Sequence, residues 1–384
     1  MGRISLADPN HRKESYHARP ASSSADQEGR RRTALEAQKQ RRTHAIEAAR
    51  SSFQSLNFME DLSLDGASDD SDSDAVPLHL PATPASPPLD GTGSPLPAIS
   101  KEKRKRFKPK YHAWAKNLLC QPEMLDLRHS LPEELETDWR AVVCPKGKRC
   151  LIATSTDSLN GNTILYSRVA GRTLARLKTV LPPDCLLDAV WDSSLSVLWI
   201  LDVPKWRGQY LVSCEAEMRA FFISSKLSEL ETQPYLPPNP SFSPSVSPAS
   251  RPTLVLPVPS YTPLTPSTLL PLLSSLSSPS AMPAAVFAPS PPSPSSPSPA
   301  NPPFSLQTTS IPFTPDGLLL YLAAAHYESG STPLVGWVPV EVKDAELRDK
   351  EGVGRMRELV EAWERRGGPA AVANGGEEVQ MDGQ

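Results

Sequence analysis

The clearest pair of short apolar runs between polar, Pro and Gly positions in this chain lies near residue 320. Short apolar runs bounded by Pro, Gly and Asp are typical of strands, and two such runs, Leu318–Leu322 and Leu334–Val338, lie close together there. Trp337 lies on the second run, directly after Gly336. A broad aromatic face on a strand that can be closely approached could stack against a flat cationic ligand. A buried core tryptophan is the alternative interpretation.

The same criteria predict further strands and a helix between residues 111 and 230. Asn160-Gly161-Asn162 is a hairpin signal that precedes one of these strands. The expected strands are Ala141–Cys144, Cys150–Ala153, Thr163–Tyr166, Cys185–Trp191 and Leu195–Val203, and the expected helix is Glu215–Leu227. Trp191, Trp199 and Trp206 are expected in the core. Strands and helices do not alternate regularly, so the pattern predicts an α+β domain rather than a βαβ arrangement.

Residues 24–56 have a different, helical pattern. Ser24 and Gln27 fit a helix start, and strong helix formers follow them. The apolar stripe is thin, and seven basic residues lie between Arg30 and Arg50. A basic helix that buries so little area should be isolated and should fold against an acidic partner. A solvated helix, a coiled-coil fragment and a nucleic-acid-binding arm are alternatives.

Composition divides the remaining chain. Of 384 residues 43 are Pro, and most lie with Ser in two tracts that cannot bury a core. The net charge of −3 conceals a basic segment at 11–50, an acidic one at 60–74 and a basic cluster at 101–110. The basic cluster fits a nuclear-localisation signal, an RNA contact or a solvated charge run. The predicted organisation is a disordered arm at 1–23, a helix at 24–56, a disordered linker at 57–110, one domain split between 111–230 and 305–340, a disordered Pro/Ser-rich insertion at 231–304, and a tail at 341–384 that contains a helix at Ala345–Arg366.

Several function classes have little support. Five cysteines without paired spacing give neither a zinc pattern nor a disulfide framework, and they predict a reducing compartment. No apolar leader and no run of about 18 apolar residues is present, which predicts a soluble intracellular chain without a membrane partner. The motifs of hydrolases, metalloproteases and P-loop enzymes are missing. We therefore expect no metal and no cofactor.

One enzyme signature is similar but incomplete. Cys144-Pro-Lys146-Gly-Lys-Arg149, followed downstream by Asp316-Gly317, resembles the nucleotidyltransferase fold of the mRNA-capping guanylyltransferases. The nucleophilic lysine of that family sits in Lys-x-Asp-Gly, whereas Lys146 runs directly into Gly147. The resemblance implies the fold without the lysyl–nucleotide chemistry.

A second resemblance covers more of the chain. Its segments are Gln27–Arg50, Val143–Ser155, Leu201–Gly208, Cys214–Leu227, Asp316–Tyr321 and His326–Trp337. In this order they resemble the snurportins, the import adaptors for small nuclear ribonucleoproteins. The resemblance implies that the N-terminal helix binds importin-β and that the body binds the 2,2,7-trimethylguanosine cap of small nuclear RNAs, without catalysis. It also implies shuttling between nucleus and cytoplasm, with an exportin for the return.

The resemblance also implies roles for individual residues. Trp337 matches the tryptophan that stacks on the cationic base, where stacking and cation–π attraction act together. Arg149 matches a basic residue near the cap phosphates. Met124, or Leu127 in another register, stands where the family has a second tryptophan, which puts discrimination between trimethyl and monomethyl caps in doubt. The expected cap-binding residues are Trp337, Arg149, Cys144, Met124, Arg168 and Lys148, and the expected importin-β-binding residues are Arg30, Arg31, Arg32, Leu35, Lys39, Arg41, Arg42, Ile46 and Arg50.

Two other functions remain as alternatives at this point. A guanylyltransferase-like enzyme would form a covalent GMP adduct on Lys146. A general RNA-binding protein with a basic arm would bind uncapped RNA with a steep salt dependence.

Overall fold

The computed structural model describes residues 27–63, 112–115, 118–156, 161–168, 170–235, 253–289, 304–342 and 352–366. Two compact units divide the chain, one made of residues 1–42 with 109–384 and the other of residues 43–108. The first unit contains three sheets and the beginning of helix α2 (Gln27–Ser63), and the second contains the rest of that helix. The predicted arm at 1–23 and the basic cluster at 101–110 lie outside the described residues.

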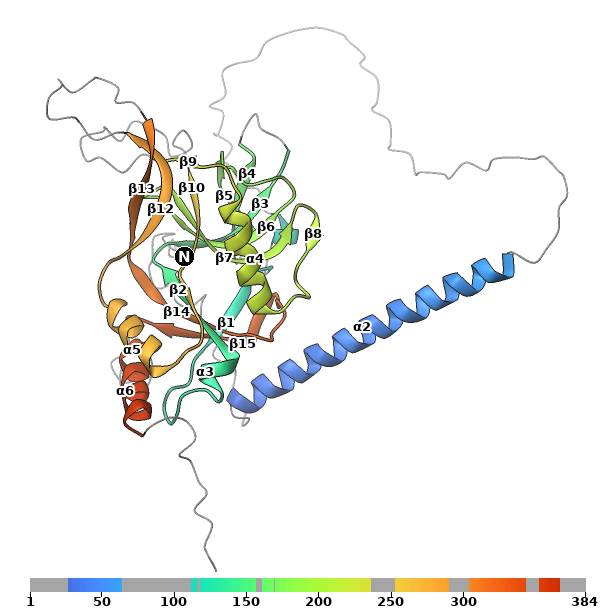
Figure 1. Cartoon of the computed structure of the whole chain (residues 1–384), viewed down its shortest axis with the longest axis horizontal. Coiled ribbons are helices and arrows are strands. Elements are labelled where there is room, and N and C mark those ends of the chain that lie inside the picture. Colours follow the sequence, from blue (N-terminus) through green and yellow to red (C-terminus); the bar gives the residue numbers. More distant parts are fainter. Residues whose placement is uncertain are drawn as a thin grey trace, which may run out of the picture. The chain divides into compact units, whose positions relative to one another are not determined.

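The first sheet has five strands, and it is built around the apolar runs near residue 320 (Figure 1). In spatial order its strands are β1 (Cys120–Met124), β15 (Gly330–Pro339), β14 (Pro315–Leu322), β2 (Trp139–Pro145) and β11 (Ser260–Tyr261). β1 runs parallel to β15, and the other neighbours are antiparallel. The strands predicted within β14, β15 and β2 are confirmed. Their apolar runs are buried almost throughout, which explains why they are nearly continuous rather than alternating.

The second sheet has seven strands. Its path is β10 (Leu254–Pro257), β7 (Val197–Trp206), β6 (Leu186–Asp192), β3 (Lys148–Thr154), β4 (Thr163–Ser167) and β5 (Thr173–Leu177), with β8 (Gln209–Tyr210) paired to β7. The strands predicted within β3, β4, β6 and β7 are confirmed, as is the helix α4 (Ala216–Ser228). Trp199 and Trp206 are buried as expected, and Trp191 is partly buried against the second core cluster.

The predicted disordered insertion at 231–304 is wrong over residues 253–289. These residues form β10, β11, α5 (Pro266–Ser275) and β12 (Ser280–Pro289), and a third sheet has the order β13 (Phe304–Phe313), β12, β9 (Gln233–Pro234). At least one proline supports the structure, although Pro271 lies inside α5. Pro266 begins α5 directly after its N-cap Thr265, whose side chain accepts from the Thr268 N–H. The prediction of disorder was wrong because it used the proline content of the segment and not the position of each proline.

The C-terminal helix is part of the core rather than of a tail. The helix predicted at Ala345–Arg366 is found as α6 (Gly352–Arg365). Its Met356 and Val360 are fully buried in the main core cluster, and α6 lies beside α5 (Figure 1). The other short elements are a 3₁₀ turn at Ala113–Ala115 and α3 (Leu135–Asp138).

Helix α2 begins at Gln27 and ends at Ser63. The prediction that it is isolated is wrong for residues 27–42, because their side chains bond to the domain that follows. Several arginines of this part of α2 pair with glutamates that lie far away in the sequence. The pattern of the helix alone could not predict these ion pairs. Among the described helices, none combines the length and the apolar character that a membrane crossing requires.

Candidate functional site

Strand register brings three of the predicted cap-binding residues to one face of the five-stranded sheet. Met124 pairs with Trp337 between β1 and β15. Trp337 pairs with Leu319 of β14, and two residues earlier on that strand Gly317 pairs with Cys144 of β2. Cross-strand partners share a face, and so do residues two apart on a strand. Met124, Trp337 and Cys144 therefore line one face, although they lie far apart in the sequence.

The indole of Trp337 lies over Gly317. A Cβ atom added at Gly317 would lie 2.6 Å from Cη2 of Trp337 and 2.5 Å from the Val338 carbonyl oxygen. No other residue type fits at this position without a shift of the ring or the strand. A glycine within a strand often marks such a close approach, and Gly317 in the apolar run after Asp316 is a signal of this kind in the sequence.

Burial does not match the expectation of an open aromatic face. Trp337 is 3% exposed and Cys144 is 1% exposed, and both belong to the main core cluster. Met124 is only partly buried and packs against that cluster. The expectation that the indole presents an accessible face is therefore wrong for this structure, because a base can stack on it only after neighbouring side chains move. The assignment of Trp337 to a cap site stays a prediction.

Arg149, which was expected to contact the cap phosphates, instead forms a buried ion pair with Asp188. Its Nε and Nη2 donate to the two carboxylate oxygens of Asp188 at 2.9 and 2.6 Å, and the two side chains are 2% and 0% exposed. Burial raises the pKa of the Asp188 carboxyl, and the positive charges of Arg149 and Arg168 oppose that rise. In this arrangement the Arg149 guanidinium neutralises a buried acid and is not accessible to a phosphate. Lys148, one residue earlier on β3, is exposed, whereas Arg168 is buried.

A second buried ion pair was missed in the sequence. Arg219 of α4 donates to both carboxylate oxygens of Asp202 on β7 at 2.8 and 2.9 Å. Its guanidinium also lies 5.5 Å from the ring centroid of Tyr327. Burial raises the pKa of the Tyr327 hydroxyl well above its usual value, and that of the Cys120 thiol to about 12. An aspartate inside the apolar run of β7 was the available signal, because a buried acid needs a cationic partner.

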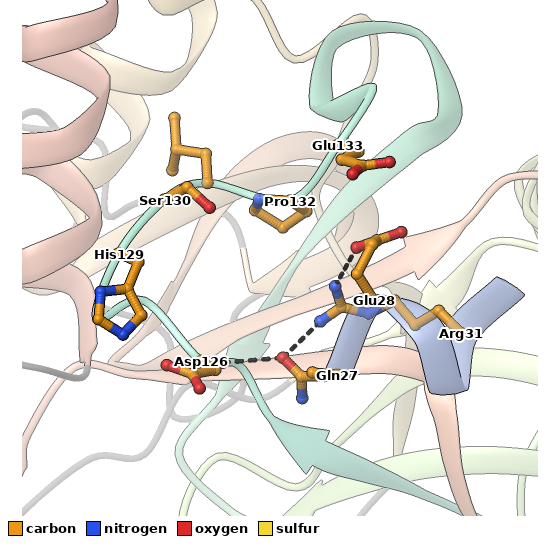
Figure 2. Close-up of a pocket in the computed structure, with 9 residues that line it drawn as sticks. Gln27, Glu28, Arg31, Asp126, His129, Ser130, Pro132 and Glu133 are labelled. Carbon is orange, nitrogen blue, oxygen red and sulfur yellow. Dashed lines mark hydrogen bonds and ion pairs between the residues drawn. The ribbon is translucent and has the colours of Figure 1, made fainter. Parts of the chain in front are cut away.

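A small polar cavity of about 120 Å³ lies where the first turn of α2 meets the loop at 126–133 (Figure 2). Its lining is Gln27, Glu28, Arg31, Asp126, His129, Ser130, Leu131, Pro132 and Glu133. None of the six predicted cap-binding residues lines it, whereas Arg31 belongs to the predicted importin-β-binding set. Within the described ranges, no group of three or more His, Cys, Asp or Glu residues could hold a metal ion.

The predicted importin-β-binding residues have unequal exposure. Leu35 is partly buried against the main core, Arg31 is 4% exposed, and Ile46 is 43% exposed. Lys39 and Arg50 are exposed. Arg30, Arg32, Arg41 and Arg42 form ion pairs with glutamates of the domain.

Comparison with protein families gives two matches at separate places in the chain. Residues 124–237 match the family model described as Snurportin1, m3G cap-binding domain, and residues 15–51 match the model described as Snurportin1. Both matches support a snurportin. The snurportin cap-domain match includes Met124, Cys144, Lys148, Arg149 and Arg168, and it ends before Trp337.

A solved structure also aligns with this chain. It is the ligase domain of LigD from M. tuberculosis, with 10% sequence identity, a TM-score of 0.31 and coverage of 58% of each chain. The chain thus spans less than two thirds of that ligase domain. A similarity at this score carries no argument about fold or activity.

Proposed function

We propose that this protein is a snurportin, a nuclear import adaptor without an enzymatic step. One part of the chain binds the 2,2,7-trimethylguanosine cap of small nuclear ribonucleoproteins, and the helix at 24–56 binds importin-β. The observation that carries the proposal is the presence of both family segments, at 15–51 and 124–237, in one chain. Cargo and importin-β then occupy separate segments and move together.

The cap site that we propose is the sheet face that carries Met124, Trp337 and Cys144. The support is the strand register, which places Met124 beside Trp337 and aligns Cys144 with Gly317 beneath the indole. Met124 lies on an edge strand and is only partly buried, and its unbranched thioether side chain adapts easily. We propose that Met124 moves aside when the base enters and then packs against the methyl groups of the cap. Lys148 is exposed and would bind the cap phosphates directly. Arg149 and Arg168 are buried and would reach the phosphates only after their side chains move.

Shuttling between cytoplasm and nucleus belongs to the same proposal, and so does an exportin that returns the empty adaptor. Importin-β would be removed from the helix in the nucleus. The cargo would follow by dissociation from the cap site.

The experiment that tests this function measures tryptophan fluorescence of the full chain during titration with monomethylated and trimethylated cap analogues. We expect saturable quenching by the trimethylated analogue and competition by capped small nuclear RNA. Displacement of the analogue by uncapped RNA with a steep salt dependence would instead identify a general RNA-binding protein. A covalent GMP adduct on Lys146 after incubation with GTP would identify a guanylyltransferase.

A further inference from the structure

The beginning of α2, residues 27–42, is seated on the domain by one helix face. Gln27, Arg31 and Gln38 are 8%, 4% and 3% exposed, and Ala34 and Leu35 pack against the main core. These positions follow the spacing i, i+4, i+7, i+8 and i+11, which places them on one side of an α-helix. The basic helix therefore has a docking face of its own.

Two glutamines anchor the ends of this face. Nε2 of Gln27 donates to the Met124 carbonyl oxygen at 2.8 Å, and its Oε1 accepts from the Asp126 N–H at 2.9 Å (Figure 2). Oε1 of Gln38 accepts from the His326 N–H at 2.9 Å, and its Nε2 donates to the His326 carbonyl oxygen at 3.3 Å. Each amide thus bonds to backbone groups through both of its ends. Such directional bonds form only when the helix has one defined position on the domain. A diffuse attraction between charges would not require that position.

Ion pairs surround the docking face. Arg30 pairs with Glu123 at 2.9 Å, Arg41 with Glu328 at 2.8 Å and Arg42 with Glu215 at 3.2 Å, and Arg32 pairs with Glu133. We name these four glutamates, Glu123, Glu133, Glu215 and Glu328, the acidic rim. The guanidinium of Arg31 lies 5.0 Å from the ring centroid of Trp139, within cation–π distance. All five arginines belong to the set expected to bind importin-β.

We propose that the acidic rim is an intramolecular binding surface for residues 27–42, and that it competes with importin-β for the same arginines. The proposal rests on the proposed function, since that function supplies the competing partner. An arginine held by a rim glutamate cannot also pair with a carboxylate of importin-β, and the docking face of the helix is covered. Importin-β therefore binds only chains whose helix has left the domain, and its apparent affinity falls by the fraction of chains in which the helix is docked.

Docking also connects the helix to the proposed cap site. Gln27 holds the carbonyl oxygen of Met124, and Arg30 holds the side chain of Glu123. Met124 is in turn the register partner of Trp337. A cap that displaces Met124 acts on the same strand that the helix holds. By linkage, cap and importin-β then change each other's affinity by the same factor, and release of β1 by the cap strengthens importin-β binding.

The test uses the full chain with changes on the rim and none on the helix. We expect the double variant Glu133→Lys, Glu328→Lys to bind purified importin-β roughly three- to tenfold more tightly than wild type, since exposed ion pairs are each weak. The matched control is Glu361→Lys, Glu364→Lys, because these exposed α6 residues give the same change of charge. Wild-type affinity in the rim variant, or an equal gain in the control, would overturn the proposal.

A second measurement needs no importin-β. Trypsin cleavage after Arg41 and Arg42, followed by mass spectrometry, reports how often the helix leaves the domain. We expect faster cleavage in the rim variant than in wild type and in the α6 control, and equal rates in all three would overturn the proposal. If no form binds importin-β, the adaptor function and the competition both fail. Slow cleavage in wild type would then still show that the helix docks on the rim.

Discussion

Met124 and Trp337 lie opposite each other where β1 runs parallel to β15, at the edge of the five-stranded sheet. One side chain is long, flexible and partly buried, and the other is large, flat and 3% exposed. A ligand that is to reach the indole face must therefore displace a neighbour, and Met124 is the neighbour that adapts most easily.

Replacing Met124 with Ala should weaken binding of the trimethylated cap analogue about threefold or more, because the thioether no longer packs on the methyl groups. The free energy of unfolding should fall by only about 1 kcal/mol, since the side chain is partly exposed. Fluorescence titration and urea denaturation measure the two effects. Met282→Ala is the matched control, because Met282 of β12 is also partly buried against the main core. Equal cap affinities of the two variants would remove Met124 from the site.

Replacing Trp337 with Ala should lower the free energy of unfolding by about 3–5 kcal/mol, because it leaves a large cavity in the core. Loss of cap binding in that variant would then report unfolding as much as a lost contact. Trp337→Phe is the better probe, because it keeps most of the apolar packing and reduces the aromatic face. We expect it to remain folded by circular dichroism and to lose at least threefold in cap affinity. Affinity within about twofold of wild type would place the cap elsewhere.

Replacing Gly317 with Ala should destabilise the protein by about 1–3 kcal/mol, because the added methyl group meets the Trp337 ring and the Val338 carbonyl. The displaced indole should also change its fluorescence maximum. Gly354→Ala is the control, since a methyl group there meets nothing within 4 Å. That helical substitution should stabilise the protein by about 0.5–1 kcal/mol. Thermal denaturation compares the two variants, and equal melting temperatures would contradict the close approach.

Replacing Arg149 with Met should cost about 3–5 kcal/mol, because Asp188 is left as an uncompensated buried charge. Burial raises the pKa of Asp188 above its unfolded value, so protonation favours the folded state. That contribution is present at acidic pH and is lost as pH rises through the raised pKa. Without Arg149 the pKa rises further, and the stability of the variant should decline with increasing pH more steeply than that of wild type.

Denaturant titrations at several pH values measure this decline. The double variant Arg149→Met, Asp188→Leu removes both charges and should recover most of the lost stability. A flat pH dependence of the single variant would show that Asp188 does not remain buried once Arg149 is gone.

Replacing Gln38 with Ala should loosen the docked helix. The partly buried backbone N–H and carbonyl of His326 lose their bonds to Gln38, which costs about 1 kcal/mol. Hydrogen exchange of residues 27–42 should become faster as a result. Gln40→Ala is the matched control, because Gln40 is exposed and its side chain bonds within the helix, to Glu36. Equal protection in the two variants would mean that Gln38 does not anchor the helix.

The strands near residue 320 could be predicted because their apolar runs are short, dense and bounded by Pro and Gly. β10 and α5 were missed because the proline count of the region outweighed two local signals, the run Leu254-Val255-Leu256 and the cap Thr265-Pro266. The burial of Trp337 was not predictable, since a stacking and a core tryptophan share the same local pattern. Whether the indole is buried depends on which side chains of the folded protein cover the strand.

The contact between the beginning of α2 and the domain could not be predicted from the local sequence pattern, for a different reason. Arg30 and Arg41 are charged positions that fit a solvated helix face equally well. Their partners are distant in sequence: Glu123 lies on β1, and Glu328 lies in the segment between β14 and β15. A signal was nevertheless present in Gln27 and Gln38, because their spacing places two amides on the same side of the helix as Leu35.

The few residues from β10 to β11 join the two large sheets. β10 pairs with β7 of the seven-stranded sheet, and β11 pairs with β2 of the five-stranded sheet. Between them the Pro259 carbonyl oxygen accepts from the Val143 N–H at 3.0 Å. Without β10 and β11, the longer strands β7 and β2 would become the edges of their sheets, and long edge strands favour aggregation. A short stretch whose composition resembles that of a spacer therefore covers both of these strands.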